Sequence, residues 1–537
     1  MINNKHLQIA IFILLLPICI LKCDAETAGI GGYGTFIISN ISGKYNLEIT
    51  GDNLLGAKLM DSAGVQEGDV SLNKVGQLNR WQKWLISKQA NGFYKIMNLY
   101  SGKYLTALAG NDKSGLSIVQ YHKTLEDAQY WIIKQLGGNK YEIINKKNLQ
   151  LLSRKAGYLN GPLVLNNNAQ DDTKLWKITP IAPDSYRDDE VVRFFQRTVG
   201  SDAFDEGSSI PLYSNMNKGE VLWVTGDTFY NQVDSKGEFS CNLIFPYHNS
   251  VLLQPADHSW DPAKTKNLIS KDGAQVFNPS NPKSLFWPGA GVEIGDKIYV
   301  HNIEVVAGTL NTVNQYLGVI TESPDTNISP VKMVEVSGMS GQTAIVYTIG
   351  MVKPAGQYIY AYGLGGMMAA NIYVARFRPE SPTKWTFWNG ETWAAKPSTS
   401  AEAVVAKGPV NNNGVGYVNG KYVLITMDFG FTCDGPGKNM YSSISDSPTG
   451  PFIHKKLIYS VPDYKQGHSP VFYNPTVHAE FDNGHRELLI AYCLNFYNKN
   501  DKGQNTCLTP CSNPDGSMDP NDYRIKGIRV PYSLMGL

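Results

Sequence analysis

Residues 93–108 read FYKIMNLYSGKYLTAL, and QYW follows at 129–131. The same combination occurs twice more, as TFIISNISGKYNLEI at 35–49 with QKW at 82–84, and as KYEIINKKNLQLLSR at 140–154 with KLW at 174–176. The three tryptophans, Trp84, Trp131 and Trp176, are therefore 47 and 45 residues apart. A fixed period of this length indicates one structural unit that buries its apolar face only against copies of itself.

Residues 31–181, which contain these units, alternate apolar and polar residues in short runs interrupted by Gly, Asn and Asp. Such a pattern is typical of antiparallel strands in a closed barrel, and three units predict a β-trefoil. The Gln-x-Trp motif with SGKYL upstream resembles the ricin-type lectin trefoil. That resemblance implies a carbohydrate-binding module in which the tryptophans pack in the core.

The resemblance also implies where sugar would bind in the trefoil. In the family, an acidic residue follows the Leu of the SGKYL-like stretch, and this position holds Glu48, Thr106 and Ser153 in the three units. Only Glu48 is acidic, and Lys174 replaces the third Gln of the motif. We therefore expect weak sugar binding, chiefly through Glu48. Tyr121 with His122 could form an aromatic platform in the second unit, or could be ordinary solvent-facing strand residues.

The first residues of the chain indicate export, and its charge balance bears on its partner. Residues 1–25 have a basic start, an apolar run at 9–21 and small residues before Glu26, as in a signal peptide. No second apolar run of membrane-spanning length follows, so we expect a secreted protein, extracellular or periplasmic, without a membrane span. Basic and acidic residues balance at 48 and 47, which disfavours nucleic acid as a partner. The expected partner is a polysaccharide or another glycan, and the oligomeric state stays open.

Export permits disulfides, and an odd number of cysteines remains after residue 25. An odd number leaves at least one thiol free or paired between chains. Cys507 and Cys511 flank a Pro-containing loop and could pair with each other or with Cys493. No second short-spaced Cys or His pair supports a zinc site, nothing indicates a structural calcium ion, and we expect no cofactor. The five cysteines are Cys241, Cys433, Cys493, Cys507 and Cys511.

A second, longer period occupies residues 189–537, after a Pro-containing connector. Five segments combine a Gly-bearing turn with an apolar strand, and helical periodicity is almost absent. Five repeats of a four-stranded sheet predict a five-bladed β-propeller. The whole chain is thus expected to be all-β, a β-trefoil followed by a five-bladed β-propeller. The corresponding strand residues are Val221, Ile298, Ile359, Val423 and Leu488.

Polar residues of the propeller are expected to meet at one mouth of its central funnel. In each blade the inner strand starts at this face and the next strand ends there. Carboxylates beside Asn, His and Trp side chains are what glycoside cleavage requires, because one carboxyl protonates the leaving oxygen and another activates water or attacks the sugar. The candidate acids are Asp202, Asp205, Asp227, Glu304 and Asp428, and the candidate substrate-binding residues are Trp287, His301, Asn249, His478 and Asn495.

Several motifs carry a further resemblance. LWVTGDTFY at 222–230, FWPGAGVEIGDKIYV at 286–300 and DSPTGPF at 446–452 resemble a family of secreted bacterial five-bladed propellers without an assigned activity. That family is similar in layout to arabinanase and invertase-like glycosidases. The resemblance implies Asp202 as base or nucleophile, and position favours Glu304 as general acid.

Two functions follow from the sequence, with a third kept open. The first is a glycoside hydrolase, with an arabinan-like substrate as one possibility, held to a polysaccharide by its trefoil. The second is a non-catalytic glycan-binding protein that uses both domains. A protein-binding scaffold is the third, because propellers also bind peptides. The hydrolase requires two carboxyls that face each other across the funnel, whereas a binding protein would neutralise these acids with internal Arg or Lys partners.

Overall fold

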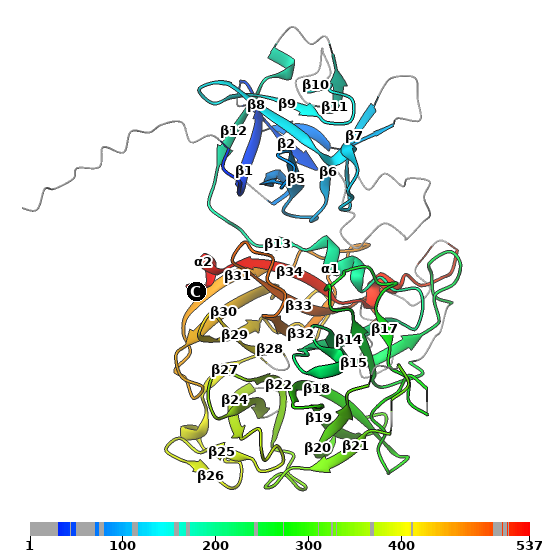
Figure 1. Cartoon of the computed structure of the whole chain (residues 1–537), viewed down its shortest axis with the longest axis vertical. Coiled ribbons are helices and arrows are strands. Elements are labelled where there is room, and N and C mark those ends of the chain that lie inside the picture. Colours follow the sequence, from blue (N-terminus) through cyan, green and yellow to red (C-terminus); the bar gives the residue numbers. More distant parts are fainter. Residues whose placement is uncertain are drawn as a thin grey trace, which may run out of the picture.

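The computed structural model of the chain contains two all-β domains, a trefoil and a propeller (Figure 1). The signal-peptide prediction for 1–25, Cys241 and Cys511 lie outside the residues that the structure describes. The structure describes residues 30–42, 44–49, 70–74, 80–109, 116–154, 161–167, 172–240, 245–271, 273–309, 311–323, 326–328, 330–365, 370–409, 412–497, 507–508, 513 and 515–537.

Twelve strands of the described residues form the trefoil, in one sheet that closes on itself because each strand at its ends also pairs with a strand further along the sheet. The prediction of a β-trefoil is confirmed. The strands are β1 (Tyr33–Asn40), β2 (Tyr45–Ile49), β3 (Val70–Lys74), β4 (Lys83–Lys88), β5 (Tyr94–Asn98), β6 (Tyr104–Ala109), β7 (Leu116–Tyr121), β8 (Trp131–Gly137), β9 (Lys140–Asn145), β10 (Leu151–Arg154), β11 (Gly161–Asn166) and β12 (Trp176–Pro180).

The three repeated tryptophans occupy equivalent places in this domain. Trp84, Trp131 and Trp176 are all fully buried in one apolar core. In each unit the indole Nε1 donates to the backbone carbonyl of the Leu in the SGKYL-like stretch: Leu47 accepts at 3.0 Å, Leu105 at 3.0 Å and Leu152 at 2.9 Å. Buried indoles need such a partner. The sequence period is therefore a structural period.

Five sheets arranged as blades form the propeller, as predicted. In each blade the strand named first below lies innermost, and the sheet extends outward from it. The blades are β14 (Ser201–Pro211), β15 (Val221–Tyr230), β16 (Ser250–Gln254) and β17 (Lys266–Asn267); β18 (Ser284–Ile294), β19 (Lys297–Val306), β20 (Thr312–Thr321) and β21 (Lys332–Glu335); β22 (Ile345–Val352), β23 (Ile359–Gly365), β24 (Ala370–Phe377), β25 (Thr386–Trp388), β26 (Trp393–Ala394) and β27 (Ala406–Gly408); β28 (Asn413–Val418), β29 (Lys421–Met427), β30 (Asn439–Ser445) and β31 (Ile453–Ser460); and β32 (Val471–His478), β33 (Glu487–Asn495), β34 (Lys526–Pro531) and β13 (Tyr186–Arg187).

Helices are short and lie between strands or at the end of the chain. They are α1 (Asp189–Phe194), α2 (Tyr532–Met535) and the 3-10 helices η1 (Arg80–Gln82), η2 (Asp127–Gln129), η3 (Asp172–Lys174), η4 (Asn215–Asn217), η5 (Ala401–Ala403) and η6 (Pro520–Tyr523). In the described part of the chain, no helix has the length and apolar character needed to cross a bilayer.

The last blade closes the ring with a strand from the other end of the propeller. β13 pairs with β34, so the strand nearest the trefoil completes the sheet that contains the C-terminal strands. The buried Arg187 guanidinium of β13 pairs with Asp463 at 2.7 Å. The start of the propeller is thereby tied to its last blade.

The two domains meet at this closing blade (Figure 1). The Glu487 carboxylate accepts from Tyr33 of the trefoil at 2.9 Å and from Tyr186 of β13 at 2.7 Å. Arg80 of the trefoil donates to the Ser460 carbonyl at 3.4 Å. A shared carboxylate thus links the trefoil, the connector and the propeller.

The disulfide in the described residues joins Cys433 to Cys507, with 5.4 Å between their Cα atoms. The pairings expected for Cys507, with Cys511 or Cys493, are therefore wrong. Cys493 is a free, buried thiol. The bond spans 74 residues of sequence, so short spacing was not a guide to the partner.

Candidate functional site

A cavity of about 990 Å³ lies along the axis of the propeller. The inner strands β14, β18, β22, β28 and β32 all contribute to its wall, so it is the space that the five blades enclose. Cavities of this size, partly apolar and with a few polar groups, are typical of small-ligand and substrate sites.

Three carboxylates lie together on one part of the cavity wall: Asp205 and Glu206 on β14, and Asp227 on β15. A β-bulge breaks the alternation of β14 at these residues, and Glu206 has a left-handed backbone with φ of 67°. The bulge turns two consecutive acidic side chains towards the cavity, where a regular strand would send one to each face. Gly226 completes the arrangement, because a Cβ there would lie 2.4 Å from Oδ1 of Asp205.

Burial and mutual repulsion raise the pKa of two of these acids. Burial and the Asp227 charge raise the pKa of Asp205 to about 7, although hydrogen bonds from Tyr523 and Tyr473 oppose the shift. The Tyr473 hydroxyl donates to Oδ2 of Asp205 at 2.9 Å. Burial, then the charges of Asp205 and Asp227, raise the pKa of Glu206 well above its usual range. These effects favour the protonated form of Glu206.

The third acid, Asp227, accepts hydrogen bonds from two donors. Nδ1 of His248 lies 2.7 Å from Oδ1 of Asp227, and Nε1 of Trp287 donates to the same oxygen at 3.1 Å. The hydrogen bond to Asp227 raises the pKa of His248, against the effect of burial. The cluster thus combines Glu206, whose raised pKa favours its protonated form, with Asp227, which is held by His248 and Trp287.

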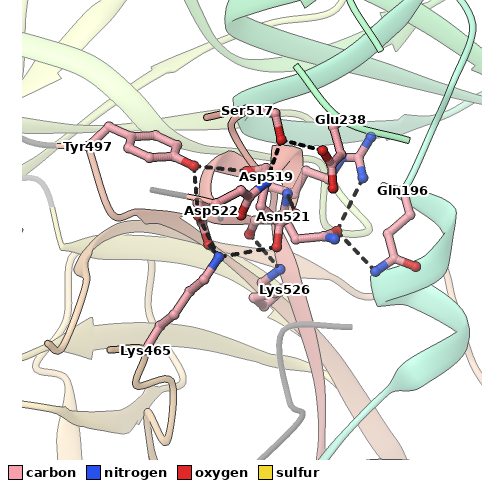
Figure 2. A network of polar contacts seen from close by, with 11 residues as sticks. Gln196, Glu238, Lys465, Tyr497, Ser517, Asp519, Asn521, Asp522 and Lys526 are labelled. Atoms are coloured by element: carbon pink, nitrogen blue, oxygen red, sulfur yellow. Dashed lines mark hydrogen bonds and ion pairs between the residues drawn. The ribbon is translucent and has the colours of Figure 1, made fainter. Parts of the chain in front are cut away.

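A polar network behind the cluster fixes the segment that carries Tyr523, the last residue of η6. Lys465 binds Asp522 at 2.7 Å and Asp519 at 3.2 Å, and the Tyr497 hydroxyl donates to Asp522 at 2.6 Å. Figure 2 shows how these side chains converge on η6 from separate loops. The network also includes Gln196, which donates to Asn521 at 3.0 Å, and Ser517, which donates to Glu238.

Asp202 and Glu304, the predicted base and acid, lie towards the expected face of the propeller but are not among the residues that line the cavity. Oδ2 of the buried Asp202 accepts from the backbone N–H groups of Gln232 at 2.6 Å and Val233 at 2.9 Å, and so caps the turn after β15. Ile303 lines the cavity, and its neighbour Glu304 therefore points to the opposite face of β19.

Four other predicted residues also lie outside the lining of the cavity. Asp428 accepts from the backbone of Asn439 at 2.8 Å and orders a loop. Asn249 is buried and donates to the Phe277 carbonyl at 2.9 Å. His301 is fully buried near Trp385, and burial lowers its pKa to about 3. Asn495 accepts from the backbone of Tyr497 at 2.7 Å.

His478 requires a correction, because it was expected at the same mouth of the funnel as the acids. It is the last residue of β32 and lies at the opposite end of the propeller axis from the acid cluster. Asp205, Asp227 and Trp287, in contrast, are brought together at the cavity wall. Glu206 and His248 were missed. The only sequence signal for Glu206 was its position directly before Gly207, where a bulge is favoured.

In the trefoil, Glu48 does not form an open pocket. It is 6% exposed, and Nε2 of Gln82, from the QKW motif, donates to its Oε2 at 2.5 Å. Gln129 of the second unit makes the equivalent contact with Thr106 at 3.0 Å. The position after the Leu therefore serves to hold the motif's Gln. Tyr121 is half-buried and packs on His122, with ring centroids 3.8 Å apart. Within the described ranges, no group of three His, Cys, Asp or Glu side chains is placed to hold a metal ion.

Comparisons with known proteins place both domains. No curated protein matches the chain in sequence. A crystal structure of a Bacteroides ovatus ATCC 8483 protein, provisionally described as a hydrolase, is 16% identical with a TM-score of 0.50, and the match covers 64% of this chain and 90% of that one. A ricin B-like lectin from Macrolepiota procera, solved with lactose, is 14% identical with a TM-score of 0.23, over 28% of this chain and 99% of the lectin.

Family models match each domain separately. Residues 80–165 match the model described as a ricin-type beta-trefoil lectin domain-like family, and this match supports a carbohydrate-related protein. Residues 188–519, more than half of the chain, match the model described as a domain of unknown function, DUF5005. The chain therefore belongs to the DUF5005 family.

Proposed function

We propose that the protein is a secreted glycoside hydrolase that cleaves a polysaccharide in the axial cavity of its propeller. The observation that carries this proposal is the convergence of Asp205, Glu206 and Asp227 on one wall of the cavity. Glycoside cleavage requires one protonated and one ionised carboxyl, in environments that separate their pKa values. The raised pKa of Glu206 suits it to the role of the protonated carboxyl, and Asp227, which His248 and Trp287 hold in place, is the second carboxyl of the pair.

Each residue of the cluster then has a distinct role. Glu206 protonates the leaving glycosidic oxygen as general acid. Asp227, held by His248 and Trp287, activates water or attacks the anomeric carbon. Asp205 is a positioning residue, because it raises the pKa of Glu206 when it is ionised and because the hydrogen bond from Tyr473 fixes it in place. The sequence-based assignment of Asp202 and Glu304 predicts a different pair, so the two assignments can be tested against each other.

The alternative, a non-catalytic glycan-binding protein, would neutralise the funnel acids with internal cations. Among the described residues, the ion pair of this cluster is His248 with Asp227, and no Lys or Arg lies within ion-pair distance of Asp205 or Glu206. Uncompensated acids are costly to bury and are concentrated at catalytic sites. This favours the hydrolase. The trefoil, through its likeness to lectin-like domains, would hold the enzyme to the polysaccharide.

The test is a screen of the purified protein against plant and microbial polysaccharides, with release of reducing ends as the readout. On any polysaccharide cleaved, Glu206→Gln and Asp227→Asn should each lower turnover by about 10² or more. Glu304→Gln is the matched control, since it is also a carboxyl near this face but does not line the cavity. Full activity of Glu206→Gln together with loss in Glu304→Gln would return the assignment to the sequence-based pair.

A further inference from the structure

The axial cavity extends from the acid cluster to the opposite face of the propeller. At the first end it is lined by Asp205 and by the exposed Thr343, which precedes β22. At the other end it is lined by Tyr213 and Lys353, which follow β14 and β22 and are also exposed. Because solvent-exposed residues line both ends, the cavity is a channel with two mouths.

A directed chain of hydrogen bonds lies beside the second mouth. Burial, with the charge of Arg529, lowers the pKa of His478 to about 3, so its imidazole is neutral. The Thr476 hydroxyl lies 2.8 Å from Nε2 of His478, and Nδ1 lies 2.5 Å from the Ser209 hydroxyl, which donates to Glu480. With Ser209 as the donor to Oε1 of Glu480, Nδ1 of His478 donates to Ser209 and Thr476 donates to Nε2 of His478.

The end point of this chain faces the channel. Glu480, Ser209 and Thr476 all line it, whereas His478 lies behind them. The Tyr213 ring is next to this group: it lines the same mouth, is 68% exposed, and the Glu480 and Glu293 charges add to burial in raising the pKa of its phenol. A carboxyl, a hydroxyl and an exposed aromatic ring are the groups with which proteins hold sugar residues, by hydrogen bonds and by stacking.

The distance between the second mouth and the acids suits a short oligosaccharide. Glu206 and Ser209 are three positions apart on β14, which corresponds to roughly 10 Å along a strand. One sugar ring does not span this distance, whereas a short oligosaccharide does. We propose that the second mouth of the channel is a carbohydrate subsite, in which Glu480 and Ser209 bind sugar hydroxyls and Tyr213 stacks on a ring while the same chain reaches the acid cluster.

This subsite rests on the proposed function for its substrate class, and it makes the substrate an oligosaccharide or chain end threaded along the axis. The test is calorimetric binding of arabino-, xylo- and cello-oligosaccharides, from the disaccharide upward, to the Glu206→Gln protein. Affinity should rise when the chain becomes long enough to reach Tyr213. Tyr213→Ala and Glu480→Gln should each lower affinity about tenfold for the long oligosaccharides, as loss of one charged hydrogen bond or stacking contact does, and leave the disaccharide unchanged.

Tyr213→Ala is the decisive variant, because an exposed side chain can be removed without loss of fold. Asp446→Asn, a change at an exposed aspartate that does not line the channel, is the control and should bind every oligosaccharide as the parent does. Equal affinity of the Tyr213→Ala protein for all lengths, or no binding of any oligosaccharide, would overturn the subsite. Length-dependent binding without cleavage of any polysaccharide would retain the subsite and refute the hydrolase, so the two proposals fail separately.

Discussion

Asp205→Asn should stabilise the propeller at neutral and alkaline pH while it impairs the site. The pKa of Asp205 rises from 3.8 in an unfolded chain to about 7 in the folded protein. Between these values the folded state holds a proton that the unfolded state has lost, so the free energy of unfolding falls as pH increases. At 1.36 kcal/mol per pKa unit, the parent loses about 4 kcal/mol from this group between pH 4 and pH 8. Asn does not titrate, and its carbonyl can still accept from Tyr473.

The measurement is urea unfolding of the parent and the Asp205→Asn variant at several pH values, followed by a probe of the propeller transition. The variant's stability relative to the parent should rise with pH through this window and become constant above pH 8. Asp446→Asn, an exposed aspartate on the fourth blade, is the control and should show no such trend. A difference between variant and parent that is constant from pH 4 to pH 8 would mean that Asp205 is not held in a charge-disfavouring environment.

Three further changes test other parts of the structure. Trp131→Ala should destabilise the trefoil by about 3–5 kcal/mol, because it empties a fully buried site and leaves the Leu105 carbonyl unpaired; thermal unfolding that is unchanged would contradict the trefoil core. Replacement of both Cys433 and Cys507 by Ser should cost about 4 kcal/mol, the loop-closure entropy of a 74-residue separation, measured by urea unfolding against the oxidised parent. Gly226→Ala should lower turnover on any cleaved polysaccharide by about 10², because its Cβ would displace the Asp205 carboxyl; a fully active variant would exclude this geometry.

The architecture was readable from the sequence because both domains are built from repeats. The period of Trp84, Trp131 and Trp176 predicts the trefoil, and each tryptophan makes the same backbone hydrogen bond. The second strand of every blade was also located, from the Gly turn that precedes it. Turn residues and apolar runs are local signals, so they can be detected in a single sequence.

The site was harder to predict from the sequence, because it depends on departures from regular strands. Alternation assigns one face to Asp202 and the other to Asp205, but the bulge at 204–208 changes which side chains reach the cavity and adds Glu206. Bulges also interrupt β18, β22 and β32. A strand's end cannot be located by periodicity alone, which explains why His478 was assigned to the wrong end of β32. The partner of Cys507 is set by a contact that the fold creates, and rules based on cysteine spacing do not predict such a contact.

The integrity of the acid cluster is coupled to closure of the propeller ring. Tyr523 reaches Asp205 from η6, and β34 follows η6 directly, so the position of this tyrosine depends on how the last blade is held. That blade is completed by β13, whose Arg187 pairs with Asp463, and its Glu487 is bound by Tyr33 of the trefoil. The trefoil therefore contacts the same blade that delivers a hydrogen bond to the site. A lectin-like domain attached at this blade can be rigid with respect to the cavity, whereas a domain on a free linker would leave the orientation of a bound polysaccharide undetermined.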